Sequence, residues 1–148
     1  MSAGSRVILL STTLTVASTV TANYLLYNAS KGAIEQMARV MSKELAPKGI
    51  MVNAVAPEPT ATELFLKGKP EQMLRAIASL NPQGRLGEPD EIADAIVFLS
   101  GKGSRWITGQ RTPVNDGMEW LKVHVLGFYE YRFTVEWLRR TPDPCIDN

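Results

Sequence analysis

Two short runs of apolar residues mark the first 56 residues of the chain. Residues 6–11 (RVILLS) and 50–56 (IMVNAVA) have the length of strands and show no strict alternation of apolar and polar positions. Such runs are typical of strands covered on both faces, as in the centre of a parallel sheet. Residues 11–23, rich in threonine and serine, carry no helical stripe and predict a loop after the first strand.

Between the two runs, apolar residues recur at the three- and four-residue spacing of an α-helix. This stripe consists of Ile34, Ala38, Met41 and Leu45. It predicts a helix that begins near residues 24–28 and ends near residue 45, ahead of Pro47 and Gly49. A strand, a long helix and a second strand form a crossover unit whose strands are parallel. The pattern therefore predicts an α/β fold with an incomplete doubly wound parallel sheet.

The pattern changes after residue 57. Residues 57–69 are polar with two early prolines, so we expect an irregular segment, followed by a short helix over 70–80. A further helix is predicted to open at residues 88–91, where acidic side chains suit the positive end of the helix dipole. Residues 119–148 are expected to form an appended tail. Six of the eleven aromatic residues lie there: Trp120, Phe128, Tyr129, Tyr131, Phe133 and Trp137.

Composition and charge exclude several functions. The net charge of +1 gives no reason to expect nucleic acid or an anionic membrane as partner. Cys145 and His124 are the single cysteine and histidine of the 148 residues, which argues against a disulfide and against a zinc site. No apolar run approaches the roughly 20 residues that span a bilayer. We expect a cytoplasmic protein.

Tyr27 and Lys31 form the candidate chemical pair. They lie four residues apart, so on a helix they are neighbours on one face, and this face continues into the apolar stripe. An unperturbed tyrosine has a pKa of about 10, so it is a poor base at neutral pH. A lysine beside it favours the phenolate, which makes Tyr27 a candidate proton donor and acceptor for an alcohol or a carbonyl. The alternative is that the Tyr27–Lys31 spacing is accidental and has no chemical role.

Four stretches together resemble the short-chain dehydrogenase/reductase family. Residues 27–31 (YNASK) resemble its Tyr-x-x-(Ala/Ser)-Lys signature, and residues 6–11, 52–57 (VNAVAP) and 85–93 (RLGEPDEIA) agree in order and spacing. The resemblance is greatest to fungal-type ketoreductase-like members. It implies that residues 1–118 are the C-terminal part of a Rossmann-like domain, with residues 106–114 as its last strand.

The resemblance also implies roles for individual residues. Tyr27 protonates the substrate oxygen as hydride arrives, and Lys31 assists it and binds the nicotinamide ribose. The family's serine at the end of the preceding strand falls on Thr12 when counted from residue 6, and on Thr13 when counted back from the tyrosine. Either hydroxyl is a candidate for binding the substrate oxygen.

The loop after the second strand resembles the family's Pro-Gly-x-x-x-Thr segment, which embraces the nicotinamide. Pro57, Thr60 and Thr62 match it, whereas Glu58 replaces the glycine. We expect Glu58 to strain the backbone and to bring a carboxylate near the cofactor, weakening its binding. The resemblance implies NADP as cofactor, with NAD as the alternative, and a small carbonyl or alcohol compound as substrate.

Two functions remain open from the sequence. The first is an NAD(P)(H)-dependent oxidoreductase, expected to be a homo-oligomer in its complete form. The second is a catalytically inactive fragment or an interaction module, because the family's glycine-rich phosphate turn is absent from the 148 residues. In that case we expect an open sheet edge that exposes positions such as Val7 and Leu9 and invites association.

Overall fold

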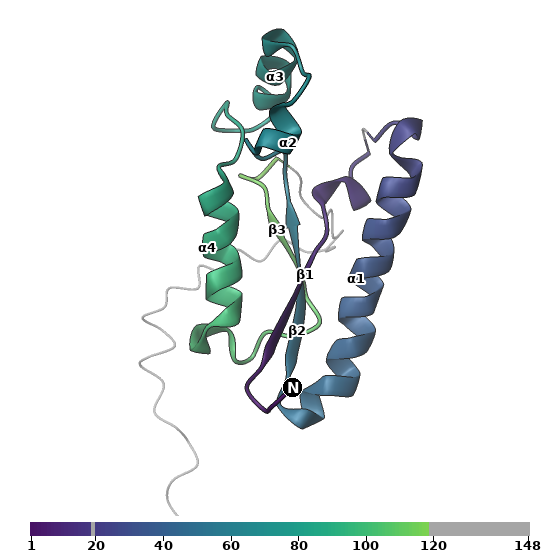
Figure 1. Cartoon of the computed structure of the whole chain (residues 1–148), viewed down its shortest axis with the longest axis vertical. Coiled ribbons are helices and arrows are strands. Elements are labelled where there is room, and N and C mark those ends of the chain that lie inside the picture. The colour runs from purple at the N-terminus through teal and green to yellow at the C-terminus, as the bar shows by residue number, and fades with distance from the viewer. Residues whose placement is uncertain (19, 119–148) are drawn as a thin grey trace, which may run out of the picture.

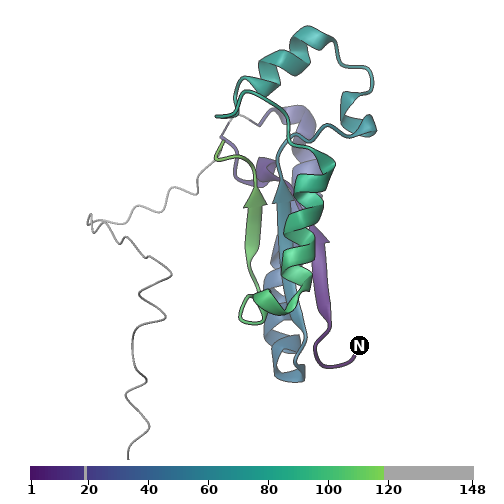
Figure 2. The ribbon, with the colours of Figure 1, turned by 90° about the vertical axis from the view of Figure 1, so that its left-hand side faces the viewer.

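The computed structural model describes residues 1–18 and 20–118, which contain three parallel strands with helices on both sides (Figure 1). The strands are β1 (Arg6–Leu10), β2 (Met51–Pro57) and β3 (Arg111–Val114), in the order β1-β2-β3. Figure 2 shows them side by side with their carboxyl ends at the same edge. The predicted incomplete parallel α/β sheet is confirmed, and the predicted tail lies outside the described residues.

Two helices cover the sheet. Helix α1 (Leu25–Leu45) packs on one face and α4 (Pro89–Ser100) on the other (Figure 1). Both helices were predicted, as was α3 (Glu71–Ala78). The prediction that residues 57–69 are irregular throughout was wrong, because they contain the short helix α2 (Glu63–Leu66), which begins where the Thr62 side chain accepts a hydrogen bond from the Phe65 N–H at 3.2 Å.

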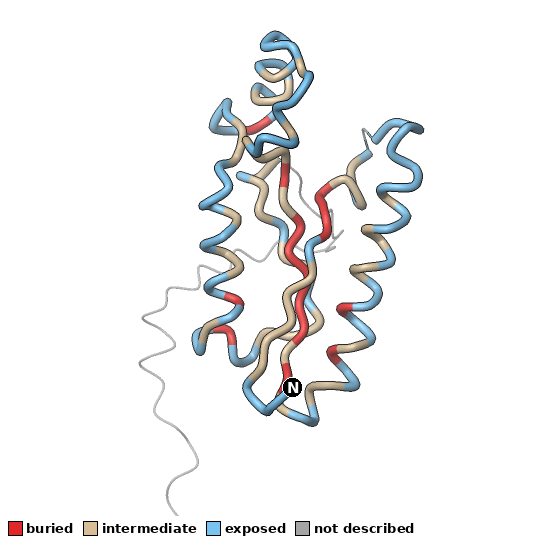
Figure 3. The backbone as a smooth tube through the Cα atoms, in the orientation of Figure 1, coloured by how far each residue is buried: buried red, intermediate tan, exposed pale blue. Residues whose placement is uncertain are grey.

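The core is centred on β2, which runs buried through the middle of the molecule (Figure 3). Val52 and Ala54 pack with Ala38 of α1 in one cluster, and the small alanines let the helix approach the sheet closely. Asn53 is also fully buried on this strand, and both ends of its amide are bonded. Its Nδ2 donates to the Ile107 carbonyl at 2.9 Å and its Oδ1 accepts from the Gln110 N–H at 3.0 Å, which fixes the loop before β3.

The start of α4 is held by acidic side chains, as the sequence predicted. The Glu91 carboxylate accepts from the backbone N–H of Glu88 and forms an ion pair with Arg85 at 2.6 Å. The Arg85 hydrogen bond lowers the pKa of Glu91 to about 2, with help from the Glu88 N–H. Within the described residues, no helix is both long and apolar enough to cross a membrane.

The outer edge of β1 pairs with no other strand of the described part. The Ser5 carbonyl and the Ser11 N–H both bond β2, so the odd-numbered residues of β1 direct their backbone groups to that partner. The even-numbered residues Arg6, Ile8 and Leu10 therefore direct theirs to the open side. The predicted open edge is present, but its positions differ from the expectation, because Val7 and Leu9 pair with β2 and pack in the core.

We expect the open edge of β1 to drive self-association. Ile8→Pro removes an outward N–H without breaking a β1–β2 bond, so it should reduce association while the chain stays folded. Leu9→Pro is the matched control, since it removes an N–H that serves the ladder, and it should lower the melting temperature instead. Sedimentation velocity and circular dichroism measure the two effects, and unchanged association in a folded Ile8→Pro variant would contradict the expectation.

Candidate active site

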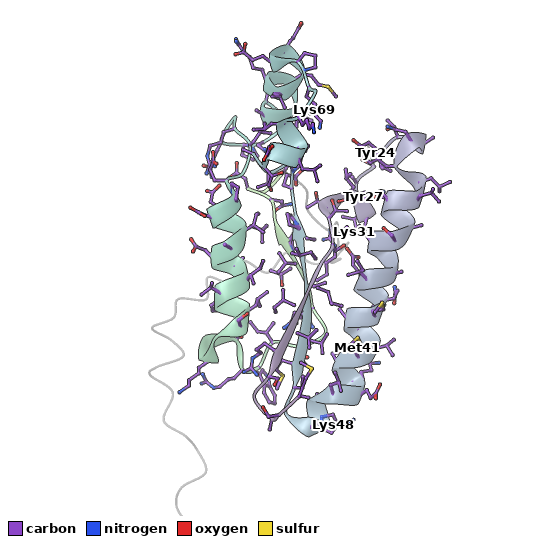
Figure 4. The ribbon with its side chains drawn as sticks, viewed as in Figure 1. Tyr24, Tyr27, Lys31, Met41, Lys48 and Lys69 are labelled. Carbon is purple, nitrogen blue, oxygen red and sulfur yellow. The ribbon has the colours of Figure 1, made fainter. Side chains whose placement is uncertain are left out.

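A cleft of about 380 Å³ opens at the carboxyl edge of the sheet. The loop after β1, the start of α1, the loop after β2 and the α2 segment form its walls (Figure 4). The residues that line it are Ser11, Thr12, Leu14, Tyr24, Tyr27, Pro57, Glu58, Pro59, Thr60, Thr62, Leu64, Phe65 and Lys69. The fold therefore brings most of the candidate residues to one cleft, because parallel strands present their following loops at the same edge.

Tyr27 lies in the first turn of α1, in the cleft wall. Its side chain contacts the ring of Tyr24 edge to face, with 6.2 Å between ring centroids. The residue is 44% exposed, so it is less enclosed than the amphipathic pattern suggested, and the described residues leave this side of the cleft open. The residue as a whole is therefore partly exposed in the wall of the cleft.

Lys31 lies one turn further along α1, next to Tyr27 as predicted. Its Nζ is 5.7 Å from the centroid of the Tyr27 ring, within the range of a cation–π contact. The same Nζ donates to the Leu10 carbonyl at 2.8 Å, on the open side of β1. Lys31 does not line the cleft, and its ammonium joins the helix to the last residue of the strand.

The two candidate threonines occupy different environments. Thr12 lines the cleft, and its hydroxyl accepts the Leu14 N–H at 3.4 Å. Thr13 is 1% exposed, is not among the residues lining the cleft, and donates its hydroxyl to the Pro57 carbonyl at 3.3 Å. Thr12 is itself only 7% exposed, but it belongs to the wall of the cleft, whereas Thr13 lies in a contact between two loops.

The loop after β2 contributes Pro57, Thr60 and Thr62 to the cleft. The Thr60 hydroxyl donates to the Glu58 carbonyl at 2.8 Å, while Thr62 caps α2. These three residues are the part of the described chain that resembles a nicotinamide-binding loop. Glu58 also lines the cleft and is 9% exposed.

The expected backbone strain at Glu58 is absent. Among the described residues other than glycine, Asp116 alone has a positive φ. The Glu58 N–H instead donates to the Val114 carbonyl at 3.1 Å, which continues the β2–β3 ladder beyond Pro57. Glutamate fits because the chain stays extended here, so the prediction of strain was wrong. What remains of the prediction is that an acidic residue lines the cleft.

An ion pair between Glu35 of α1 and Arg111 of β3, which sequence analysis missed, lies beside the site. The Glu35 carboxylate oxygen Oε1 accepts from Arg111 Nε at 2.8 Å, from the Ser11 hydroxyl at 2.6 Å and from the Thr15 hydroxyl at 2.7 Å. Arg111 Nη2 also donates to the Thr12 carbonyl at 3.2 Å. The side chains of Arg111 and Glu35 are 19% and 14% exposed, so solvent screens the pair only weakly.

This network ties together the parts that carry the candidate residues. Glu35 lies one turn beyond Lys31 and two beyond Tyr27 on the same face of α1. Arg111 comes from β3, at the other side of the sheet from β1. The one available signal was the position of Glu35 on the Tyr27 face, but 76 residues separate it from Arg111. Only the folded sheet brings the two side chains together.

The sequence matches a known family over most of the described region. Residues 1–119 match the family model described as enoyl-(acyl carrier protein) reductase. A chloroplastic NADPH-dependent aldehyde reductase-like protein of Arabidopsis thaliana is 41% identical over 114 residues, which are 77% of this chain and 42% of that protein. A short-chain type dehydrogenase/reductase of Picea abies is 40% identical over 91 residues, 62% of this chain and 34% of the relative. The chain belongs to the short-chain dehydrogenase/reductase family.

Solved structures of ketoreductases share the fold. The angucycline C-6 ketoreductase LanV with bound NADP superimposes with a TM-score of 0.71 and 34% identity, covering 80% of this chain and 45% of LanV. The reductase LugOII, which catalyses keto-reduction at C1 during lugdunomycin biosynthesis, gives the same TM-score and identity over 80% of this chain and 46% of its own. The chain thus spans less than half the length of these relatives and corresponds to part of a Rossmann-like domain.

Arg111→Met should destabilise the chain by about 2–3 kcal/mol, because it leaves the Glu35 carboxylate without its charged partner in a largely desolvated position. Arg75→Met is the matched control. It removes an ion pair of 2.5 Å to Glu71 whose side chains are 75% and 77% exposed, so no measurable change is expected. Urea unfolding of both variants measures the difference, and equal stabilities would show that the buried pair contributes no more than the surface one.

Proposed function

We propose that this chain supplies the proton-transferring part of an NADP(H)-dependent carbonyl reductase. The observation that carries the proposal is the position of Tyr27 in the wall of an open cleft, with Thr12 in the same wall and Lys31 beside the tyrosine ring. Membership of an oxidoreductase family and the NADPH-dependent relatives support it. The reverse oxidation of an alcohol uses the same groups.

Tyr27 acts as the general acid in this proposal. As the carbonyl carbon gains a hydride, its oxygen gains an electron pair and takes the proton of the Tyr27 hydroxyl, which gives an alcohol and a phenolate. The Thr12 hydroxyl donates a hydrogen bond to the same oxygen and stabilises its developing negative charge. The positive charge of Lys31 favours the phenolate that is left on Tyr27.

NADPH, when bound, supplies the hydride. Pro57, Thr60 and Thr62 line the cleft and would hold its nicotinamide end, with Lys31 near the ribose. The carboxylate of Glu58 lies in the same wall and disfavours negatively charged parts of the cofactor. No glycine-rich turn for the phosphates occurs in the 148 residues, so we propose that activity needs a further segment that provides one.

A non-catalytic interaction module is the second candidate. It is favoured by the open edge of β1 and by exposed apolar side chains along α1, where Leu26, Met37 and Val40 are 82%, 51% and 64% exposed. A helix of a monomer normally keeps such residues on its buried face. In this case the chain would pair with copies of itself or with complete relatives through α1 and β1.

Tyr27→Phe should abolish turnover in a protein that joins this chain to a dinucleotide-binding segment of the family. General acid catalysis typically contributes about 10²- to 10⁴-fold, and the substitution removes the transferred proton while keeping the ring. The affinity for NADPH should stay nearly unchanged. Initial rates and a fluorescence titration with NADPH, made side by side, test the role, and retention of more than about a tenth of the activity would assign the acid to another group.

The 148-residue chain alone should neither bind NADPH measurably nor reduce carbonyl compounds, because it has no turn that binds the phosphates. Fluorescence titration with NADPH, combined with light scattering, measures binding and association on one sample. Association without cofactor binding is the expected result. A stoichiometric micromolar site on a monomer would contradict the expectation and would make this chain a complete cofactor-binding unit.

A further inference from the structure

Lys69 occupies a distinct place in the cleft. Tyr24 and Tyr27 form the wall on the α1 side, and Lys69 lies across from them, beside α2 (Figure 4). Among the described residues that line the cleft, Lys69 is the one basic residue and Glu58 the one acidic residue. The cleft is therefore electrically asymmetric, and a ligand that enters it meets a positive charge on the wall opposite Tyr27.

The position of the Lys69 ammonium is fixed by local structure. The chain turns at Gly68, with a φ of +73°, and the Lys69 N–H donates to the Leu66 carbonyl at 3.2 Å. This turn folds Lys69 back over Phe65. Its Nζ lies 4.3 Å from the centroid of the Phe65 ring and donates to the Phe65 carbonyl at 2.5 Å. An ammonium has three donors, so others remain for a ligand.

Both sides of the cleft carry apolar or aromatic side chains beside the polar ones. Leu64 and Phe65 come from α2, and Leu14 and Tyr24 from the α1 side. An aromatic or aliphatic body fits between these side chains, while its anionic group avoids Glu58 and turns toward Lys69. With the carbonyl at Tyr27 and Thr12, this arrangement sets both the kind of ligand and its direction in the cleft.

We propose that the substrate is a carbonyl compound with a hydrophobic body, for example an aromatic one, and an acidic substituent, and that Lys69 binds the acid group. This inference rests on the reductase function proposed above. Lys69 is then a specificity-determining residue. It forms a charge-assisted hydrogen bond to the acid, fixing the orientation of the carbonyl toward Tyr27.

The test is ligand binding by the 148-residue chain, which needs neither cofactor nor turnover. Naphthalene-2-carboxylate and its neutral methyl ester are titrated separately by saturation-transfer and chemical-shift NMR. The carboxylate should bind about three- to tenfold more tightly than the ester at low salt, and the preference should shrink in 1 M salt, where the screening length falls to about 3 Å. Inorganic phosphate should not displace the carboxylate.

Lys69→Met should remove the preference for the carboxylate and leave the ester unchanged. Lys67→Met is the matched control, because Lys67 lies two residues away, is exposed and does not line the cleft. Equal binding of the two ligands, no binding of either, displacement by phosphate, or the same loss from both variants would each overturn the proposal. Failure of the reductase function would appear instead as unchanged turnover in Tyr27→Phe, with the Lys69 preference intact.

Discussion

The burial of β2 is the constraint on which the rest of the described structure depends. Its residues 52–56 are inaccessible to solvent, with α1 on one face, α4 on the other and a parallel strand along each edge. A strand in this position needs every backbone group bonded and every side chain packed. The crossovers through α1 and α4 make β1 and β3 parallel to β2, and so set the edge at which the three following loops meet. The cleft is a consequence of that arrangement.

A single carboxylate oxygen then organises the loops at this edge. Oε1 of Glu35 accepts hydrogen bonds from the loop after β1 and from Arg111 of β3, and Glu35 itself belongs to the helix that carries Tyr27. The candidate proton donor and the Thr12 loop are thereby attached to the same ion pair. Hydrogen bonds to a charged group in a partly desolvated position are stronger than those on the surface. The Glu35–Arg111 ion pair therefore holds Tyr27 and the Thr12 loop in fixed relative positions. The chemistry proposed for Tyr27 requires this positioning.

The cleft also illustrates how charge is distributed around a site. Glu58 takes the glycine position of the Pro-Gly-x-x-x-Thr segment that this loop resembles, yet the extended backbone accommodates it without strain. Glu58 lines the same cleft that Lys69 borders from the α2 side. The position of the Lys69 ammonium follows from its neighbours in the chain, since the chain turns at Gly68 and the ammonium packs on the ring of Phe65. Glu58 and Lys69 come to line one cleft only when the loop after β2 and the α2 segment are folded together.

The sequence by itself determined the elements and the principal chemical pair. Apolar runs and helical spacing depend on neighbouring residues, so the strands, the α1 stripe and the contact of Lys31 with Tyr27 were predictable. Three features were decided only by tertiary structure: the Glu35–Arg111 ion pair, the placement of Thr12 but not Thr13 in the cleft wall, and the extended backbone at Glu58. Each depends on where β3 or the loop after β2 comes to lie beside another element, and such distant contacts leave no periodic signal in the chain.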